Sequence, residues 1–340
     1  MRRIVDQIVQ LRQDGVSVVL VSSGAAAAGR ERLGLPMDAK DVPARQVLAA
    51  VGQARLMHDW DQIMAEHGIV TAQALLTRQD VGHRQGYLNA RTTLLNLLER
   101  GVLPIINEND VVAVEEIKIG DNDYLSALVA NLVDAELLVM LTDTGGLYTA
   151  DPQLDSAASL IPIVHSIGPE LERQAGSTRS GVGTGGMRTK LTAARAAVRW
   201  GTTVVIAAGS DPSALIRAAR GEAVGTRFPA AAAVEGRKRW LVTGVAGRGE
   251  LVVDAGAERA LLHSGKSLLS AGVRDVRGRF ARGDAVQIRA TEGPVIAIGL
   301  SNYDARDLLL IAGHRSEEIS ALLGYTYGPE VVHRNNLAVL

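Results

Sequence analysis

The chain has 340 residues, of which 47% are hydrophobic, 21% are charged and 3% are aromatic. This length predicts two domains, and the composition predicts a sizeable aliphatic core. The net charge of −1 gives no bulk attraction to nucleic acid or anionic membranes. The absence of cysteine excludes disulfides and thiolate metal sites and suits a reducing, cytoplasmic compartment. No apolar run reaches the length of a membrane span.

Helical and strand-like segments alternate along the first two thirds of the chain. Helices are predicted over residues 2–14, 44–67 and 84–100, and from the polar cap at 120–123 to about residue 132. Apolar strands are predicted over residues 16–21, 69–72, 102–106, 137–141 and 203–207. Continuously apolar strands between helices indicate a mostly parallel sheet covered on both faces, which is a three-layer α/β sandwich.

Polar or glycine-rich clusters directly follow three of these strands, at residues 22–24, 107–110 and 142–146. In a parallel sheet these positions share the carboxyl edge, where such folds bind ligands. Ser23 and Gly24 precede an alanine-rich helix, so their backbone N–H groups suit a substrate carboxylate, although a plain turn is the alternative.

Four aspartates near these strand ends and helix starts are candidates for holding a substrate amine or the shell of a Mg²⁺ ion. They are Asp110, Asp121, Asp123 and Asp143. The alternative for Asp121 and Asp123 is simple helix capping, and the alternative for residues 107–110 is an ordinary turn.

A glycine-rich stretch, Gly181–Lys190, predicts a polyphosphate site. Its glycines let backbone N–H groups surround an anion, the helix that follows adds its unpaired amides, and Lys190 adds a full positive charge. A flexible Gly/Ser loop is the alternative. The dinucleotide fingerprint is disfavoured because no strand directly precedes the glycines and residue 206 is Ile, and a Walker A loop is excluded by Met187 after Gly186.

The sequence offers no obvious covalent catalyst. It has no Ser-His-Asp arrangement, His83 and His165 are interpreted as ordinary loop residues, and no histidine cluster has metal-ligand spacing. The site therefore depends on positioning and charge neutralisation, which are the two requirements of phosphoryl transfer.

From about Trp240 onward, short β-like pieces separated by glycine predict a small β-rich barrel of about 80 residues. The pieces lie at residues 249–256, 282–289 and 295–300. We expect an α/β domain over residues 1–230, a linker over 231–246, the barrel domain over 247–330 and a C-terminal tail over 331–340.

Several long motifs, in one register along the chain, resemble the glutamate 5-kinases of the amino acid kinase family. They are Val21–Gly29, Ile106–Asp110, Ile117–Ala127, Leu141–Asp143, Gly145–Pro152 and Gly183–Lys190. Three C-terminal pieces resemble the PUA domain that many of these kinases carry, namely Val253–Gly256, Gly265–Leu269 and Phe280–Asp284. The resemblance implies the amino acid kinase fold followed by a PUA-like domain.

The resemblance also implies ATP-dependent phosphorylation of the L-glutamate side-chain carboxylate to L-glutamyl 5-phosphate, the first step of proline biosynthesis. It assigns glutamate contacts to Ser23, Asp110 and Asn122. It assigns ATP contacts to Thr142, Asp143, Thr184, Gly185, Gly186, Met187, Arg188, Thr189 and Lys190. Lys190 would stabilise charge on the transferring group, Asp123 would orient that lysine, and Mg²⁺ would bridge the ATP phosphates. Such enzymes are typically cytoplasmic homo-oligomers inhibited by proline.

One feature departs from the family pattern. The family begins with a strand carrying a lysine and a Gly-Ser/Thr turn, whereas Met1 lies inside the helix that follows. About 25–30 residues are expected to precede it, which corresponds to one strand, its loop and half a helix. We interpret this as a misassigned start codon or a shortened chain.

Two other functions stay open. One is another amino-acid or acyl-phosphate kinase of the same fold. The other is an RNA-binding protein acting through the PUA-like domain. Five arginines cluster there, at 274, 277, 279, 282 and 289. However, residues 247–340 contain 11 basic and 11 acidic residues and so have no net charge.

Overall fold

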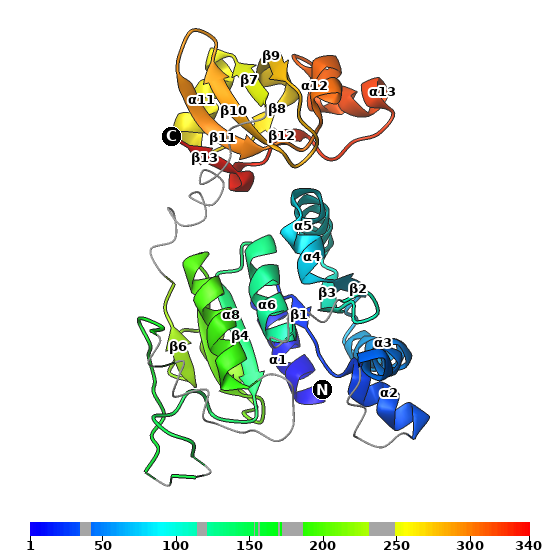
Figure 1. Ribbon diagram of the computed structural model, residues 1–340, viewed down its shortest axis with the longest axis vertical. Helices are drawn as coiled ribbons and strands as arrows, with labels where there is room; N and C mark the ends of the chain where they lie inside the picture. The colour runs from blue at the N-terminus through cyan, green and yellow to red at the C-terminus, as the bar shows by residue number, and fades with distance from the viewer. Residues whose placement is uncertain are drawn as a thin grey trace. The chain divides into compact units, whose positions relative to one another are not determined.

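The computed structural model describes residues 1–34, 42–113, 121–152, 154–155, 157–168, 171, 186–230 and 249–340 (Figure 1). The chain divides into two compact units, one of Met1–His83 with Asn89–Ala231 and one of Arg84–Leu88 with Ala232–Leu340. The predicted linker at 231–246 lies outside the described residues.

The first unit contains the mostly parallel sheet that the sequence predicts, in two three-stranded parts. One part has the order β1–β3–β2 with all strands parallel, and the other has β4 and β5 parallel with β6 antiparallel at the edge. The strands are β1 (Leu20–Val21), β2 (Thr71–Leu76), β3 (Leu103–Glu108), β4 (Leu137–Thr142), β5 (Thr203–Ala208) and β6 (Thr226–Phe228).

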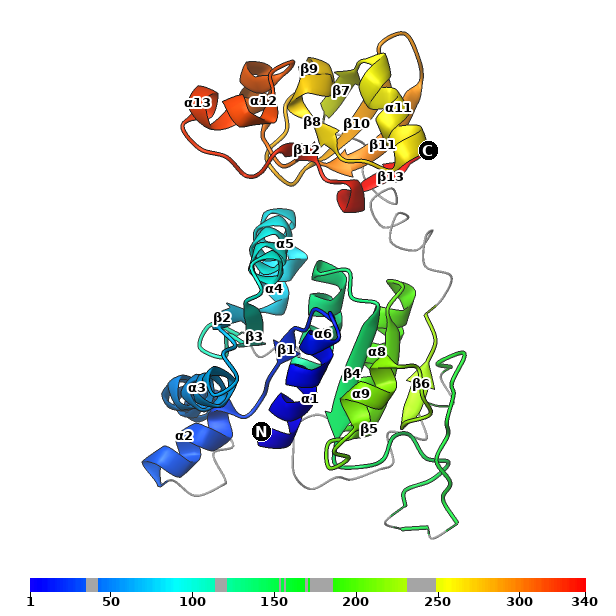
Figure 2. The ribbon, with the colours of Figure 1, turned by 180° about the vertical axis from the view of Figure 1, so that it is seen from behind.

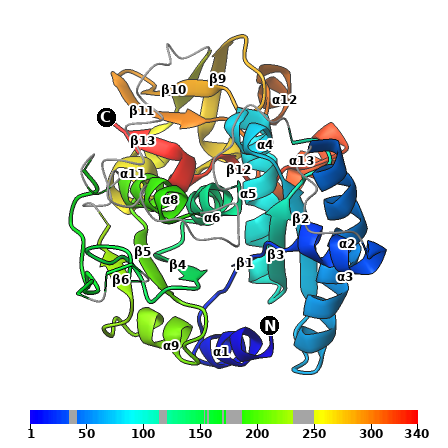
Figure 3. The same ribbon diagram turned by 60° about the horizontal axis from the view of Figure 1, so that its bottom comes forward.

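Helices cover both faces of these strands and give the three layers seen in Figure 3. The helices of this unit are α1 (Arg2–Gln13), α2 (Ala25–Leu33), α3 (Val42–Ala65), α4 (Arg78–Gly82), α6 (Asp121–Leu132), α8 (Met187–Arg199), α9 (Ala214–Ala219) and the part of α5 (Arg84–Glu99) that follows Leu88. Helix α6 packs on β1, β3 and β4, so it links the two parts of the sheet.

Strand β5 shows why the sheet is buried on both sides. Val204 and Ile206 pack with α8, whereas Val205 and Ala207 pack with α9 on the opposite face (Figure 2). Alternate residues of a strand point to opposite faces, so an apolar residue at every position is what a two-sided burial requires.

Helices α2 and α3 cross at unusually close range. A Cβ atom on Gly52 would lie 1.8 Å from the Ala25 carbonyl oxygen, and one on Gly29 would lie 1.8 Å from the Leu48 carbonyl oxygen. Only glycine fits at either position, so the crossing fixes α2, which starts just after Ser23, against α3.

The C-terminal unit is β-rich, as predicted. Its larger sheet has the order β13–β11–β10–β7–β9, and a second small sheet pairs β12 with β8. The strands are β7 (Gly249–Val253), β8 (Leu268–Leu269), β9 (Val273–Gly278), β10 (Ala285–Ala290), β11 (Val295–Leu300), β12 (Glu330–Val332) and β13 (Leu337–Val339). Helices α11 (Ala255–Ser264), α12 (Ala305–Ile311) and α13 (Ile319–Leu323) accompany them around one aliphatic core.

Four predicted segments differ from the structure. The strand expected at 16–21 is reduced to its last two residues, and the one expected at 69–72 begins at Thr71 and runs to Leu76. The piece at 249–256 turns into α11, because the Asp254 carboxylate accepts a hydrogen bond from the Ala257 N–H at 2.8 Å and caps a helix. The tail expected at 331–340 includes β13, which pairs with β11.

Among the described residues, none of the helices combines the length and the apolar character needed to cross a membrane.

Candidate functional site

An ion pair joins the start of α6 to the start of α8. The Lys190 ammonium lies 2.9 Å and 3.1 Å from the two Asp123 carboxylate oxygens, and only 12% and 16% of these side chains is exposed. The Thr189 hydroxyl lies 2.6 Å from Asp123 and 2.7 Å from the Gly186 carbonyl oxygen. Two of the residues predicted for the phosphate site, Thr189 and Lys190, therefore meet at the Asp123 carboxylate.

A chain of three side-chain amides adjoins this ion pair. Asn122, next to Asp123 in the first turn of α6, donates from Nδ2 to Asn107 Oδ1 at 3.1 Å. Asn107, at the end of β3 and 2% exposed, donates from Nδ2 to Gln53 Oε1 on α3 at 2.7 Å. Among the described residues, Asn122 Oδ1 and Gln53 Nε2 are buried without a hydrogen-bond partner. Asn107 therefore joins the other two amides, and each of those carries one buried polar atom without a partner.

The turn after β1 lies next to β3. Val21 pairs with Ile106, and the Ser22 N–H donates to the Ile106 carbonyl oxygen at 2.8 Å. The Trp60 indole N–H donates to the Ser22 hydroxyl at 2.9 Å in a buried position. Ser23 follows as an exposed residue. Gly24 comes next, directly before α2, and adopts a φ of 112°, which residues other than glycine rarely adopt.

Other predicted residues lie at the same strand ends. Asp110 is half-buried in the turn after β3. At the end of β4, the Thr142 hydroxyl donates to the exposed Asp143 carboxylate at 2.9 Å. In the first turn of α8, Arg188 is exposed and Met187 packs against the core of α8 and β5.

The structure leaves some predicted residues outside its description. These are Thr184, Gly185 and the rest of the glycine loop before Gly186, the motif residues Ile117–Gly120, and the side chain of Asp121. Their predicted roles remain predictions.

In the described part of the chain, no cluster of three or more His, Asp or Glu side chains could hold a metal ion. The arrangement offers a largely buried ammonium beside hydrogen-bonding amides and hydroxyls. Such groups can neutralise and orient an anionic reactant.

Sequence reasoning missed Gln53 and Trp60, since both lie within α3 and look like ordinary helix positions. A weak signal exists, since Gln53 and Trp60 are seven residues apart and so share a helix face that also carries the buried Leu56.

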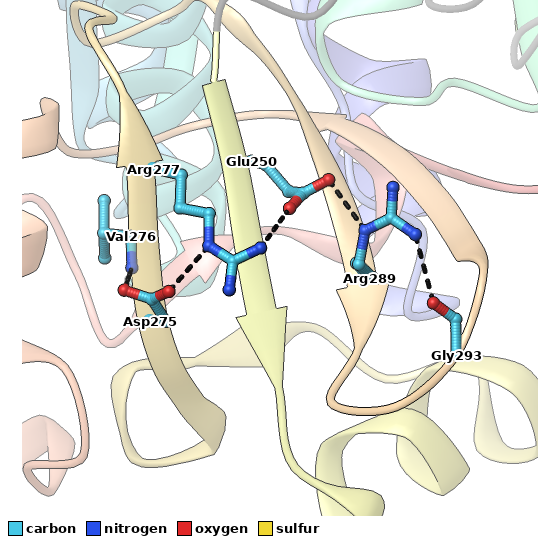
Figure 4. A network of polar contacts seen from close by, with 6 residues as sticks. All are labelled: Glu250, Asp275, Val276, Arg277, Arg289 and Gly293. Atoms are coloured by element: carbon cyan, nitrogen blue, oxygen red, sulfur yellow. Dashed lines mark hydrogen bonds and ion pairs between the residues drawn. The ribbon is translucent and has the colours of Figure 1, made fainter.

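The arginine cluster of the C-terminal unit is largely paired with carboxylates. Glu250 lies between Arg277, at 3.1 Å, and Arg289, at 2.8 Å, and Arg277 also binds Asp275 at 2.7 Å (Figure 4). Arg274 binds Asp254 at 2.8 Å. Arg282 instead stacks on the Tyr327 ring, 3.8 Å from its centroid. This pairing reduces the positive charge available to a polyanion.

Comparison with known proteins identifies the first unit. The model of the amino acid kinase family matches residues 1–208, which is more than half of the chain. The chain belongs to the amino acid kinase family. The model of the PUA domain matches residues 249–323, so this amino acid kinase carries a C-terminal PUA domain.

Curated relatives match the amino acid kinase chain over almost its whole length. The glutamate 5-kinase of Trichlorobacter lovleyi is 50% identical over 99% of this chain and 90% of its own. Those of Herpetosiphon aurantiacus and Deinococcus radiodurans are both 52% identical, over 97% and 99% of this chain and 90% and 94% of their own. A solved UMP kinase from Bacillus anthracis is 16% identical, with a TM-score of 0.47, over 68% of this chain and 87% of its own. The resemblance predicted from the motifs is thus confirmed by the curated relatives.

Proposed function

We propose that this chain catalyses ATP-dependent phosphorylation of the L-glutamate side-chain carboxylate, giving L-glutamyl 5-phosphate for proline biosynthesis. One observation supports the proposal beyond the names of the relatives. Asn122 and Asp123 are neighbours in the first turn of α6, and they connect the amide chain on one side with Lys190 on the other. An acceptor held by the amides would thus lie beside the charge that the phosphoryl group needs.

The proposed step is an in-line transfer. A glutamate carboxylate oxygen forms a bond to the γ-phosphorus of ATP. The bond between that phosphorus and the β,γ-bridging oxygen breaks, and ADP leaves with the electron pair. The nucleophile is already ionised at neutral pH, so no general base is required. Lys190 would stabilise negative charge on the transferring group, and Asp123 would hold the ammonium in place.

The remaining roles follow the family motifs. Ser23, Asp110 and Asn122 would bind glutamate. Thr142 and Asp143 would bind ATP, and residues 184–190 would surround its phosphates. Mg²⁺ would arrive with the nucleotide, because this ion is usually held by substrate phosphates and few protein carboxylates. A cytoplasmic location, inhibition by proline and a homo-oligomeric state remain predictions, as does RNA binding.

Hydroxamate trapping with a panel of acceptors tests the substrate. With ATP and Mg²⁺, we expect glutamate to give the largest kcat/KM, well above aspartate and N-acetylglutamate. A higher kcat/KM for either of those acceptors would replace glutamate as the substrate and favour another acyl-phosphate kinase of this fold.

A further inference from the structure

Helix α3 presents three polar side chains at seven-residue intervals, namely Gln46, Gln53 and Trp60. Seven residues make nearly two helical turns, so all three lie on one face. Gln46 Nε2 lies 3.5 Å and 3.4 Å from the carbonyl oxygens of Val111 and Ala113, just after Asp110. Gln53 holds Asn107, and Trp60 holds Ser22. One helix face thus contacts every strand end that carries a proposed glutamate contact.

The direction of each amide in the chain is set by one backbone group. The Glu108 N–H donates to Asn107 Oδ1 at 2.8 Å, and a backbone N–H cannot reverse its role. Asn107 must therefore turn its NH₂ group toward Gln53, which accepts with Oε1. Asn122 must donate to Asn107 Oδ1, and so it turns its own oxygen away from the chain.

This direction determines what Asn122 can bind. Its free atom, Oδ1, is a pure acceptor, and among the described residues it is buried without a partner. A buried acceptor without a partner is costly, so it calls for a donor. The α-ammonium of an amino acid is a charged donor of that kind, whereas a carboxylate or phosphate oxygen would be repelled.

We propose that Gln53 is a positioning residue for the acceptor. Gln53 Oε1 accepts a hydrogen bond from Asn107, and Asn107 Oδ1 accepts one from Asn122. These two bonds direct Asn122 Oδ1 at the α-ammonium of the amino acid. This inference rests on the proposed glutamate kinase activity and adds to it two residues, Gln53 and Asn107, and the atom of Asn122 that reads the amine.

The test compares two substitutions at Gln53. Gln53→Met keeps the length and volume of the side chain but leaves the Asn107 NH₂ group unpaired, and we expect the KM for glutamate to rise roughly 5- to 100-fold, as for one lost hydrogen bond to an oriented polar group. The KM for ATP should change less than about twofold. Gln53→Glu retains an oxygen acceptor for Asn107 and should recover most of the glutamate affinity.

Gln62→Met is the matched control, since Gln62 is an exposed residue of the same helix. It should leave both KM values at the wild-type level. If Gln53→Met leaves the KM for glutamate unchanged, the inference is overturned while the wild-type activity stands. The same holds if Gln53→Glu raises the KM for glutamate as much as Gln53→Met does. Equal rises in both KM values would also overturn it, because they would indicate general destabilisation. Wild-type enzyme without glutamate-dependent ADP release would instead remove the proposed function, and the inference with it.

Discussion

At the scale of single residues, the Asp123–Lys190 ion pair is the central feature of the proposed site. Both side chains are largely buried, and burying two charges costs desolvation free energy that a close pair recovers only with good geometry. Asp123 supplies that geometry, since it contacts Lys190 with both oxygens and Thr189 with one. We therefore interpret this ion pair as a means of positioning the Lys190 ammonium rather than as a source of folding stability.

Asp123→Asn tests this positioning. The amide keeps the size of the carboxylate but removes its charge and one of its two acceptor oxygens, so the ammonium is held less firmly. A misplaced catalytic group costs about 10²-fold in kcat. Steady-state kinetics measure the effect. Asp59→Asn, which breaks an exposed ion pair with Arg55 on α3, is the control and should leave kcat unchanged. An Asp123→Asn enzyme within twofold of wild type would contradict the assignment.

Glu250 provides a pH-dependent prediction at the same scale. The hydrogen bond from Arg289 lowers the pKa of Glu250, and the charges of Arg289 and Arg277 lower it further, against the opposing effect of burial. A lowered folded-state pKa means that the stabilisation is present above the ordinary glutamate pKa of about 4.3 and is lost as the pH falls through the lowered value.

Thermal unfolding between pH 6 and pH 3 measures this contribution. We expect Glu250→Gln to be less stable than wild type at pH 6 and the difference to shrink toward pH 3. Glu292→Gln, at an exposed turn position, should show no such convergence. A difference between Glu250→Gln and wild type that stays constant with pH would show that the carboxylate charge is not involved.

At the scale of elements, the sequence predicted the strands and helices that carry their own signal. The apolar runs gave β3, β4 and β5, and the helical pattern gave α3 and α5 within two residues. The short β1 could not be predicted, since Val16–Val19 are as apolar as a strand but have no described partner strand. The contact of Gln53 with Asn107 could not be predicted either, because it depends on which face of α3 meets β3.

The close crossing of α2 and α3 gives a prediction for Gly52. Gly52→Ala places a methyl group inside the van der Waals radius of the Ala25 backbone, so the helices must separate, and overpacking of this kind costs about 1–3 kcal/mol of unfolding free energy. Urea unfolding measures the loss. Gly82→Ala, at the end of α4 with open space around its added methyl, is the control and should be neutral or slightly stabilising. Equal stabilities for the two variants would contradict the crossing.

At the scale of the whole molecule, two separate sets of core residues underlie the two units. Leu251 belongs to the core of the C-terminal unit, and Val204 belongs to the core of α6, α8 and β5 in the first unit. Both side chains are completely buried. Each unit thus has the hydrophobic core that independent folding requires.

Scanning calorimetry should therefore resolve two transitions. Leu251→Ala should lower one of them, through a loss of about 2–5 kcal/mol, and leave the other in place. Val204→Ala should lower the other transition, by a smaller change in its midpoint temperature, and leave the first one in place. A single transition lowered by both substitutions would mean that the units unfold as one.

Steady-state kinetics of Lys190→Ala, with ATP and glutamate varied in turn, decide whether the ammonium beside Asp123 serves phosphoryl transfer. We expect kcat to fall about 10²- to 10³-fold, as on removal of one group that stabilises developing charge, with little change in the KM for glutamate. Lys266→Ala, at an exposed lysine of the C-terminal unit, should match wild type. Wild-type turnover by Lys190→Ala would contradict the proposed site.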